Sequence, residues 1–307
     1  MNSPKIYKPI IKWVGGKTQI LDKLLTEFPK EMNNYHELFL GGGSVLFALL
    51  SHMRSGAISV RGQVLAYDAN EPLIYLYKNI QSSPTEVFAE IQRIINDYNE
   101  SPAAGIVNRA PANINEAKLT KENYYYWIRS EFNKLSPADK KTVLGSAMFI
   151  FLNKTCFRGL FRVGPRGFNV PYGHYTNPEI VNKDHLDEIH CLIQGVVFEV
   201  CDFSASIAKA VSDDFVYLDP PYAPETETSF VGYTENGFNK DNHIALFNSV
   251  HKLSAQGTKI MMSNADVKLV RDNFATENYK IATVLCKRSI NSKKPESKTN
   301  EVIINNY

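Results

Sequence analysis

The chain has 307 residues, of which 44% are hydrophobic and 21% charged, so it can bury a sizeable core and is neither disordered nor fibrous. Its 34 basic and 32 acidic residues leave a net charge of +2, which excludes recognition of a polyanion by bulk charge alone. The four cysteines form no CxxC pair, which argues against a structural zinc site and against a disulfide-stapled secreted fold. No stretch approaches the roughly 20 apolar residues of a membrane span, so we expect an untargeted cytoplasmic protein with no membrane partner.

The first part of the chain alternates between helix-like and strand-like patterns. Apolar residues recur at helical spacing from Lys17 to Phe28, and Asp68, Asn70 and Pro72 give the start signals of a later helix. The predicted elements are a helix at 17–28, a strand at 36–40, a helix at 44–53, a strand at 63–67 and a helix after residue 70. This order is typical of a doubly wound parallel sheet, in which ligands bind at the carboxyl ends of the strands.

The middle third is predicted to be mainly helical. A polar loop at 101–117 precedes two helices, at 121–134 and 137–153, and Ser136 caps the second. Residues 156–175 then combine glycines and prolines with basic and aromatic residues, a pattern typical of a functional loop.

The α/β pattern returns in the last third. Strands are predicted at 196–201, 215–218, 258–262, 281–286 and 301–305, and a helix at 241–255. We therefore expect an α/β fold with a doubly wound sheet, whose domain comprises residues 1–80 and 195–307. Residues 81–194 are expected to form a mainly helical insertion with a hairpin loop at 156–175.

A glycine turn follows the strand predicted at 36–40. Gly41 and Gly43 let the backbone approach a ligand closely, but Leu46 stands where a nicotinamide-binding fingerprint needs a third glycine. Asp68 ends the next strand, where an acidic side chain commonly accepts hydrogen bonds from ribose hydroxyls. The turn and the acid together favour a nucleoside-bearing cofactor, with helix capping as the alternative role of Asp68.

A second glycine turn lies near the amino terminus. Gly15-Gly16-Lys17-Thr18 is similar to the end of a phosphate-binding loop, but Ile11 stands where that motif requires glycine, so an ATPase is disfavoured. Trp13 and Lys17 could instead supply an aromatic wall and a cation for a carboxylate-bearing ligand. The alternative is a buried tryptophan and a solvated lysine.

Asp219-Pro220-Pro221-Tyr222 directly follows a predicted strand. Two prolines remove two N–H donors and hold the backbone extended, so this segment is rich in acceptors. A carboxylate and a prolyl carbonyl can accept both hydrogens of an exocyclic amine, and the tyrosine offers a face for a planar base. The alternative is a surface turn after a strand.

Several blocks resemble, in order, the Dam-type (alpha-group) DNA adenine-N6 methyltransferases. They are Lys12 to Lys17, Glu37 to Ser44, Tyr67 to Asn70, Asn153 to Gly159, Phe168 to Pro171, Asp219 to Tyr222, Met262 to Asn264 and Lys287 to Ile290. The resemblance implies a Rossmann-like methyltransferase sheet, S-adenosylmethionine as cofactor, no metal, and double-stranded DNA as partner.

The resemblance also implies roles for individual residues. Those expected to bind the cofactor are Trp13, Lys17, Phe39, Gly41, Gly43, Asp68, Asp202, Phe203 and Asp219. The catalytic motif is Asp219, Pro220, Pro221 and Tyr222, which would align the adenine amine while Tyr222 stacks on a base swung out of the duplex.

The loop at 156–175 resembles the target-recognition hairpin of that family. Its glycines and Pro165 rule out a helical stripe of arginines, so a turn-rich hairpin is expected to present them, with ordinary solvated arginines as the alternative. The resemblance implies that Phe157 intercalates, that Leu160 and Pro171 touch a thymine methyl and that Arg162 reads a guanine. The full set of expected DNA-binding residues is Lys12, Phe157, Arg158, Leu160, Arg162, Arg166, Asn169 and Pro171.

This hairpin departs from the GATC-modifying members at two positions. Arg158 stands where they usually have asparagine, and Gly167 precedes Phe168 where they have glutamate. The expected site is therefore a short palindromic tetranucleotide such as GATC or CATG.

Two other functions were weighed against adenine methylation. One is a catalytically silent DNA-binding protein on the same scaffold, and the other is methylation of cytosine N4 or a glutamine side chain, which Asp219 disfavours. RNA stays open as a substrate. A cognate restriction endonuclease is a candidate partner, and the expected protein is a monomer or weak dimer, nucleoid-associated when bound to DNA, or in the host cytoplasm if viral.

Overall fold

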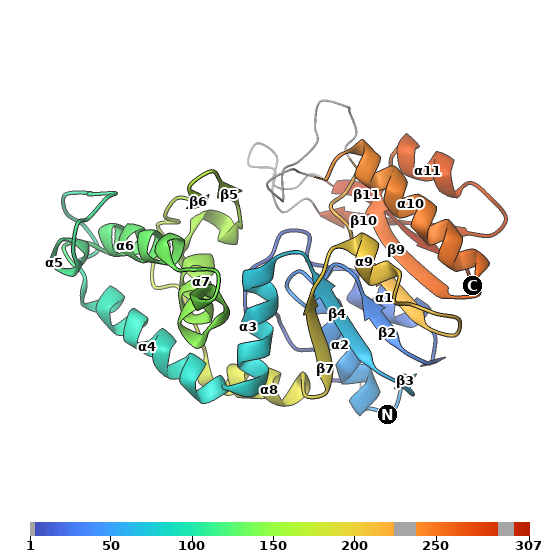
Figure 1. Cartoon of the computed structure of the whole chain (residues 1–307), viewed down its shortest axis with the longest axis horizontal. Helices are drawn as coiled ribbons and strands as arrows, with labels where there is room; N and C mark the ends of the chain where they lie inside the picture. The colour runs from blue at the N-terminus through green and yellow to red at the C-terminus, as the bar shows by residue number, and fades with distance from the viewer. Residues whose placement is uncertain (1–3, 224–237, 288–297) are drawn as a thin grey trace. The chain divides into compact units, whose positions relative to one another are not determined.

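The computed structural model describes residues 4–223, 238–287 and 298–307 (Figure 1). The chain divides into two compact units, each considered by itself below. Unit 1 comprises residues 1–7, 17–69 and 195–307, and unit 2 comprises residues 8–16 and 70–194. The expected catalytic domain had also included residues 8–16 and 70–80, which lie in unit 2; the functional role of either unit stays a prediction.

Unit 1 is built on a sheet whose strand order is β10-β11-β9-β8-β2-β4-β7. Its strands are β2 (Tyr35–Glu37), β4 (Val64–Asp68), β7 (Val196–Val200), β8 (Phe215–Leu218), β9 (Lys259–Ala265), β10 (Lys280–Lys287) and β11 (Lys298–Asn305). The strands from β9 to β7 are parallel, and β11 is antiparallel to both β9 and β10. Two short strands, β1 (Glu31–Met32) and β3 (Ser59–Val60), form a separate parallel pair.

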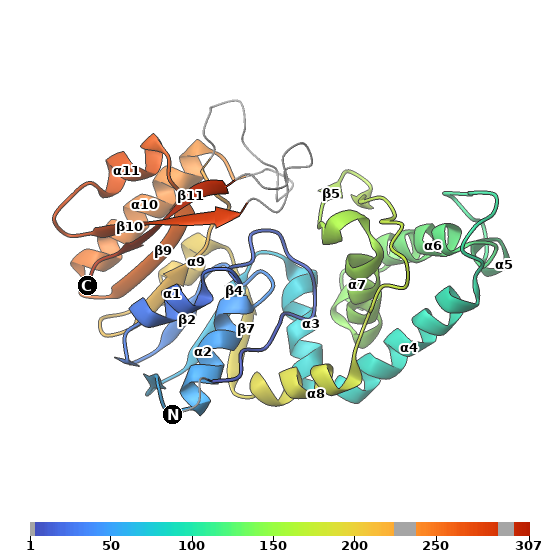
Figure 2. The same ribbon diagram turned by 180° about the vertical axis from the view of Figure 1, so that it is seen from behind.

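Helices cover both faces of this sheet, which confirms the expected doubly wound α/β fold. Helices α9 (Phe203–Ile207) and α10 (Lys240–Ala255) pack together in front of the sheet in Figure 1. Helices α1 (Leu21–Glu27) and α2 (Ser44–Arg54) pack together on the opposite face, seen in Figure 2. A further helix, α11 (Lys268–Phe274), follows β9.

The central strands are buried because parallel sheets have helices on both faces. All four residues of β8 are buried, and Val216 and Leu218 belong to one apolar cluster with Leu38, Tyr67 and residues of α10. Burial on both sides explains why this strand reads as a continuous apolar run in the sequence rather than as an alternating pattern.

The strand order reverses between β2 and β8. From β2 the chain proceeds to β4 and β7 on one side, and it then returns to β8 and β9 on the other. Glu37 pairs in register with Tyr217, so the segments that follow the two strands start side by side. Ligands of open α/β sheets bind at such a switch point, beyond the carboxyl ends of the strands.

Unit 2 is mainly helical. It contains α3 (Glu71–Ser82), α4 (Pro84–Glu100), α5 (Ile114–Ala117), α6 (Lys121–Lys134), α7 (Val143–Thr155) and α8 (Lys183–Leu192), with 3-10 turns η1 (Asp139–Lys141) and η2 (Phe157–Gly159). Helix α7 is buried along most of its length and packs against α3, α4 and α6, as expected of a helix that is apolar all round. Strands β5 (Val163–Gly164) and β6 (Gly167–Phe168) form a small antiparallel hairpin.

Most predicted elements are confirmed, and two helix starts were wrong. The helix predicted at 17–28 begins at Leu21, because the chain is still turning after Gly15, whose φ is 82°. The helix predicted at 137–153 begins at Val143, because the chain before it forms the 3-10 turn η1, whose first N–H, that of Asp139, donates to Ser136 Oγ. The loop predicted at 101–117 ends in the short helix α5. No helix in the part of the chain that the structure describes is long and apolar enough to cross a membrane.

Candidate functional site

The Asp219-Pro220-Pro221-Tyr222 segment begins directly after β8, at the point where the strand order reverses. The turn is tied to the neighbouring strand, because the N–H of Ala223 donates to Asn264 Oδ1 on β9 at 3.1 Å. The two prolines supply no N–H to this part of the chain. The segment is therefore a fixed, acceptor-rich turn at the ligand-binding end of the sheet.

Asp219 forms an ion pair with Lys17. The Lys17 Nζ lies 2.6 Å from Asp219 Oδ2, and the lysine side chain is only 4% exposed. The other carboxylate oxygen, Oδ1, is buried and has no hydrogen-bond partner among the described residues. Burial raises the pKa of Asp219 to about 6, and the Lys17 charge opposes that rise. Lys17, which the sequence predicts to serve a ligand's carboxylate, pairs in this structure with the carboxylate of Asp219; its role toward a ligand stays a prediction.

Glu37 lies at the end of β2 and is 2% exposed. The hydroxyl of Tyr35 donates to Glu37 Oε2 at 2.8 Å. Burial, together with the nearby Asp219 carboxylate, raises the pKa of Glu37 to about 8. Glu37 is therefore neutral at pH 7, which keeps a second negative charge away from Asp219. The sequence analysis had quoted Glu37 only within a motif block and had given it no role.

Tyr222 is held at both its ring and its hydroxyl. The Lys17 Nζ lies 4.8 Å from the ring centroid, and the hydroxyl donates to Glu301 Oε2 on β11 at 2.7 Å. Glu301 was missed by the sequence analysis, because it is 79 positions away in the chain and belongs to no local motif. The one sequence signal for Glu301 is its position directly before a buried apolar strand segment, Val302 to Ile304.

The glycine turn after β2 has the predicted backbone freedom. Gly41 and Gly43 have φ values of 51° and 76°, in the left-handed region that favours glycine, and Gly43 is the N-cap of α2. The N–H of Gly41 donates to Asp68 Oδ2 at 3.0 Å, which brings the turn and the acid together. Helix α3 is capped by Asn70, whose side chain accepts from the N–H of Leu73, so the helix-cap alternative for Asp68 was wrong.

Phe39 and Phe203 are two further predicted residues that lie side by side. Their rings stack with centroids 6.2 Å apart, and Phe238 packs edge-on against both. Asp202 caps α9: its Oδ1 accepts from the Ser204 hydroxyl and from the backbone N–H groups of Ala205 and Ser204, and these bonds lower the pKa of Asp202. The stacked pair therefore adjoins Asp202, the residue before Phe203 in the chain.

Trp13 and Lys12 belong to unit 2, as does the hairpin. The Trp13 ring stacks on Phe161 with centroids 5.9 Å apart, and the Lys12 ammonium lies 4.0 Å from the centroid of the Tyr175 ring. Asn153 joins these segments: its side chain accepts from the N–H of Lys12 and donates to the Lys12 and Gly159 carbonyls. Lys12 is thereby fixed beside the hairpin.

The arginines of residues 156–175 are presented by a turn-rich hairpin, as predicted. Pro165 and Arg166 form the turn between β5 and β6, and Arg166 is exposed. Arg162 Nε donates to Asn169 Oδ1 at 2.6 Å across the hairpin, which orients the guanidinium. Helix α6 holds β6, because the Asn133 side chain accepts from the N–H and donates to the carbonyl of Phe168.

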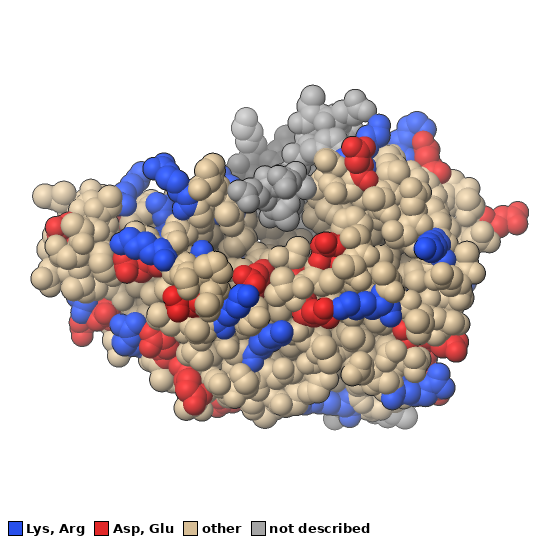
Figure 3. Space-filling view, in the orientation of Figure 1, with Lys and Arg blue, Asp and Glu red and all other residues tan. Residues whose placement is uncertain are grey.

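The other predicted DNA-binding residues lie around the base of the hairpin. Phe157 is 45% exposed, and the Arg158 guanidinium lies 5.2 Å from the centroid of its ring. Arg158 itself has a φ of 58°, a strained value for a residue other than glycine. Leu160 is half-buried, and Asn169 and Pro171 are exposed. Figure 3 shows basic side chains over the part of unit 2 that carries β5 and β6.

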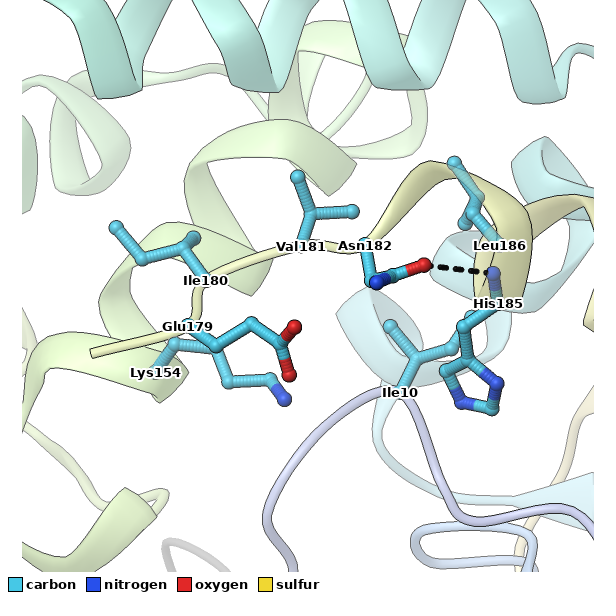
Figure 4. Close-up of a pocket in the computed structure, with 8 residues that line it drawn as sticks. All are labelled: Ile10, Lys154, Glu179, Ile180, Val181, Asn182, His185 and Leu186. Carbon is cyan, nitrogen blue, oxygen red and sulfur yellow. Dashed lines mark hydrogen bonds between the residues drawn. The ribbon is translucent and has the colours of Figure 1, made fainter.

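A small pocket elsewhere in unit 2 contains none of the predicted site residues. It is lined by Ile10, Lys154, Glu179, Ile180, Val181, Asn182, His185 and Leu186 (Figure 4). Asn182 caps α8 there, its Oδ1 accepting from the N–H of His185.

Of the predicted blocks, residues 288–290 of Lys287 to Ile290 lie outside the described residues. The described residues also contain no group of three or more His, Cys, Asp or Glu side chains that could hold a metal ion.

The comparisons with known proteins agree with this geometry. The family model of the D12 class N6 adenine-specific DNA methyltransferases matches residues 13–290. The type II methyltransferase M.MjaIII of Methanocaldococcus jannaschii is 36% identical over 98% of this chain and 99% of its own length. The type II methyltransferase M1.LlaDCHI of Lactococcus lactis is 28% identical over 98% and 95%, and the DNA adenine methylase of Haemophilus influenzae is 29% identical over 96% and 92%. The chain therefore belongs to the D12 class of N6 adenine-specific DNA methyltransferases.

Proposed function

We propose that this protein transfers a methyl group from S-adenosylmethionine to N6 of an adenine flipped out of double-stranded DNA. The target is a short palindromic site, a tetranucleotide such as GATC or CATG. One observation carries the proposal: Asp219 presents a buried oxygen, Oδ1, that has no partner among the described residues, at the switch point of the sheet. A buried acceptor without a partner is costly, and a substrate N–H group would satisfy it.

The chemistry requires alignment more than activation. The lone pair of adenine N6 is conjugated into the ring, so accepting its hydrogens at Asp219 and at the Pro220 carbonyl would direct that lone pair outward. Tyr222 would stack on the extruded base, with its ring held by the Lys17 and Glu301 contacts. Pro221 keeps this backbone extended.

The residues of the glycine turn fit the cofactor that the family implies. S-adenosylmethionine, when bound, supplies a methyl group on a positively charged sulfur. Gly41 and Gly43 have the backbone freedom for a close approach, and Asp68 and Asp202 would accept hydrogen bonds from the nucleoside part. Phe39 and Phe203 would contact the cofactor's adenine. Trp13 and Lys17 are proposed to complete this site.

DNA recognition is proposed for the hairpin of unit 2. Arg162 would read a guanine, because its guanidinium is oriented by Asn169. Phe157 would wedge between bases, Leu160 and Pro171 would touch a thymine methyl, and Lys12 would contact the outer base of the site. Arg158 and Arg166 would contact phosphates.

The biological setting follows from the proposed reaction. Two of the similar proteins are named type II methyltransferases, which supports a cognate restriction endonuclease as partner. Action on DNA places the protein in the cytoplasm, associated with the nucleoid, or in the host cytoplasm if a virus encodes it. A monomer or weak dimer is proposed as the acting form.

A labelled cofactor tests this function against the catalytically silent alternative. The purified protein is incubated with duplex DNA and methyl-labelled S-adenosylmethionine, and label in DNA is counted for the wild type, for Asp219→Ala and for the surface control Asp272→Ala. We expect label with the wild type and the control, and a loss of about 10²-fold or more with Asp219→Ala. DNA binding without any label in the wild type would establish the silent binding protein instead.

A further inference from the structure

Glu301 occupies an unusual place for an acidic residue. It lies on β11, which is paired on both sides, opposite Ala265 of β9 and Val284 of β10. The three residues that follow it, Val302 to Ile304, are buried core residues. Glu301 itself is half-buried, and a partly desolvated carboxylate beside this core is stabilised by a hydrogen-bond partner.

The contacts of Glu301 point to Tyr222. The tyrosine hydroxyl donates to Glu301 Oε2 at 2.7 Å, a short bond to a charged acceptor. On β10, Cys286 is buried, and its pKa is raised to about 11 by burial and by the Glu301 carboxylate. A thiol with that pKa stays protonated at neutral pH, so it can donate to Glu301. The Glu301 carboxylate thus lies near the Cys286 thiol of β10 and accepts the hydrogen bond of the Tyr222 hydroxyl.

Stacking by itself does not require the hydroxyl. A phenylalanine presents the same ring face, so a hydroxyl bonded to a carboxylate constrains where the ring lies rather than what it can touch. The Lys17 ammonium, 4.8 Å from the ring centroid, is the other contact that limits ring movement. Two fixed contacts on one ring define its plane.

We propose that Glu301 is a positioning residue, which fixes the plane of the Tyr222 ring against which the target adenine stacks. This inference rests on the proposed function, because it assigns how one part of the same site is held. Glu301 touches neither substrate nor cofactor in this account. Its effect reaches the reaction through Tyr222, since a small displacement of an aligned base slows an in-line transfer steeply.

Four variants test the proposal: Glu301→Ala, Glu301→Gln, Tyr222→Phe and the double variant Glu301→Ala/Tyr222→Phe. The readouts are the single-turnover methylation rate and the fluorescence of a duplex with 2-aminopurine at the target adenine, which rises when the base leaves the stack. We expect Glu301→Ala and Tyr222→Phe each to slow transfer by roughly 10-fold to 100-fold and to reduce the fluorescence rise. Cofactor affinity should not change in either variant. Glu301→Gln keeps an acceptor and should retain most of the rate.

The double variant separates positioning from a general structural role. Glu301→Ala and Tyr222→Phe each break the same hydrogen bond, so the double variant should be about as slow as either single variant. If the two residues acted independently, their losses in rate would multiply. Glu277→Ala, at an exposed glutamate of the same unit, is the matched control and should behave as the wild type.

Three results would overturn the proposal: an unchanged rate in Glu301→Ala, losses that multiply in the double variant, or a Glu301→Gln variant as slow as the alanine variant. If Glu301→Ala does not fold, Tyr222→Phe decides, because it removes one hydroxyl and leaves the sheet intact; an unchanged rate and fluorescence rise would reject the role of this bond. A wild type that puts no methyl into any DNA would refute the proposed function itself, whereas failure of the present inference leaves the wild type active.

Discussion

Asp219 links burial to activity at the scale of a single residue. In the proposed reaction its carboxyl group accepts the adenine amine hydrogens, and the ionised form is the stronger acceptor; burial raises the pKa of Asp219 to about 6 against the opposing charge of Lys17. We therefore expect the single-turnover methylation rate to fall as the pH drops below about 6. The groups that face Asp219 are Lys17, Glu37, Tyr217, Tyr222 and Glu301.

The pH profile is measured with the wild type and saturating cofactor from about pH 5 to about pH 8. Glu301→Gln is the informative comparison, because removing its negative charge should lower the pKa of Asp219 and move the acid limb to lower pH. A rate that stays flat down to about pH 5 would show that ionisation of Asp219 does not limit transfer.

Asp68→Ala is expected to weaken cofactor binding far more than DNA binding. The change removes the proposed acceptor for a ribose hydroxyl and the carboxylate that holds the Gly41 N–H. A hydrogen bond to a charged group contributes about 1.5 to 3 kcal/mol, which corresponds to roughly 10-fold to 100-fold in the dissociation constant. Calorimetry with S-adenosylmethionine measures this, and Asn70→Ala, which removes the cap of α3, is the control. Unchanged cofactor affinity in Asp68→Ala would leave Asp68 only the role of supporting the glycine turn.

Arg162→Ala should relax specificity at one base position. A bidentate guanidinium contact with guanine discriminates by about 1 to 3 kcal/mol, whereas a phosphate contact carries no sequence information. The methylation rate is measured on every single-base variant of the mapped site. Arg166→Ala is the matched control, since it should weaken all sequences alike and reduce the salt dependence by about one phosphate contact. A uniform loss with Arg162→Ala would place this arginine among the phosphate contacts.

Local sequence predicted much of the site but not its pairings. The motif that begins with Asp219 was predicted because two prolines after an apolar strand form a local signal. Lys17 was also recognised, yet its bond to Asp219 is a tertiary contact that no spacing reveals. The bond between Glu301 and Tyr222 could not be predicted for the same reason, because the two residues lie in different segments of the chain.

At the scale of elements, α6 positions the hairpin through several side chains: Tyr125 and Arg129 bond the Val170 carbonyl, and Asn133 bonds β6 directly. Asn133 bonds both the N–H and the carbonyl of Phe168, at 2.8 and 3.0 Å. We expect Asn133→Ala to loosen β6, to speed hydrogen exchange of the Phe168 amide and to weaken DNA binding by about 1 to 3 kcal/mol. The methylation rate at saturating DNA should fall by a smaller factor than the DNA affinity. Lys134→Ala is the control, as an exposed neighbour on the same helix. Unchanged exchange at Phe168 would show that the hairpin is held without the Asn133 hydrogen bonds.

Element boundaries were predicted well where periodicity and caps agree. Helix α6 and strand β8 have the bounds that the sequence predicted, because Thr120 caps α6 and β8 is a short apolar run between polar residues. Helix α7 starts later, since the chain before it forms the turn η1 instead. Helix α4 was not predicted individually, although Ser83 and Pro84 mark its start and Val87, Ile91, Ile94 and Tyr98 form its buried face.

At the scale of the whole molecule, the α/β alternation predicted the doubly wound sheet and the helical insertion. It did not predict that residues 8–16 belong with unit 2, because that grouping depends on contacts such as the bonds between Asn153 and Lys12. Because the net charge is only +2, attraction to a polyanion has to come from a local group of basic residues, and Arg158, Arg162 and Arg166 form an exposed group of this kind within residues 156–175.

We propose that this chain places N6-methyladenine in one short palindromic DNA sequence. The most direct test is sequencing of DNA from a host that lacks its own adenine methylation and expresses either the wild type or Asp219→Ala, with N6-methyladenine scored in every tetranucleotide context. The account predicts nearly complete methylation of one palindrome, such as GATC or CATG, in the wild type and none with Asp219→Ala. Absence of N6-methyladenine in the wild-type host, or equal methylation in both hosts, would contradict it.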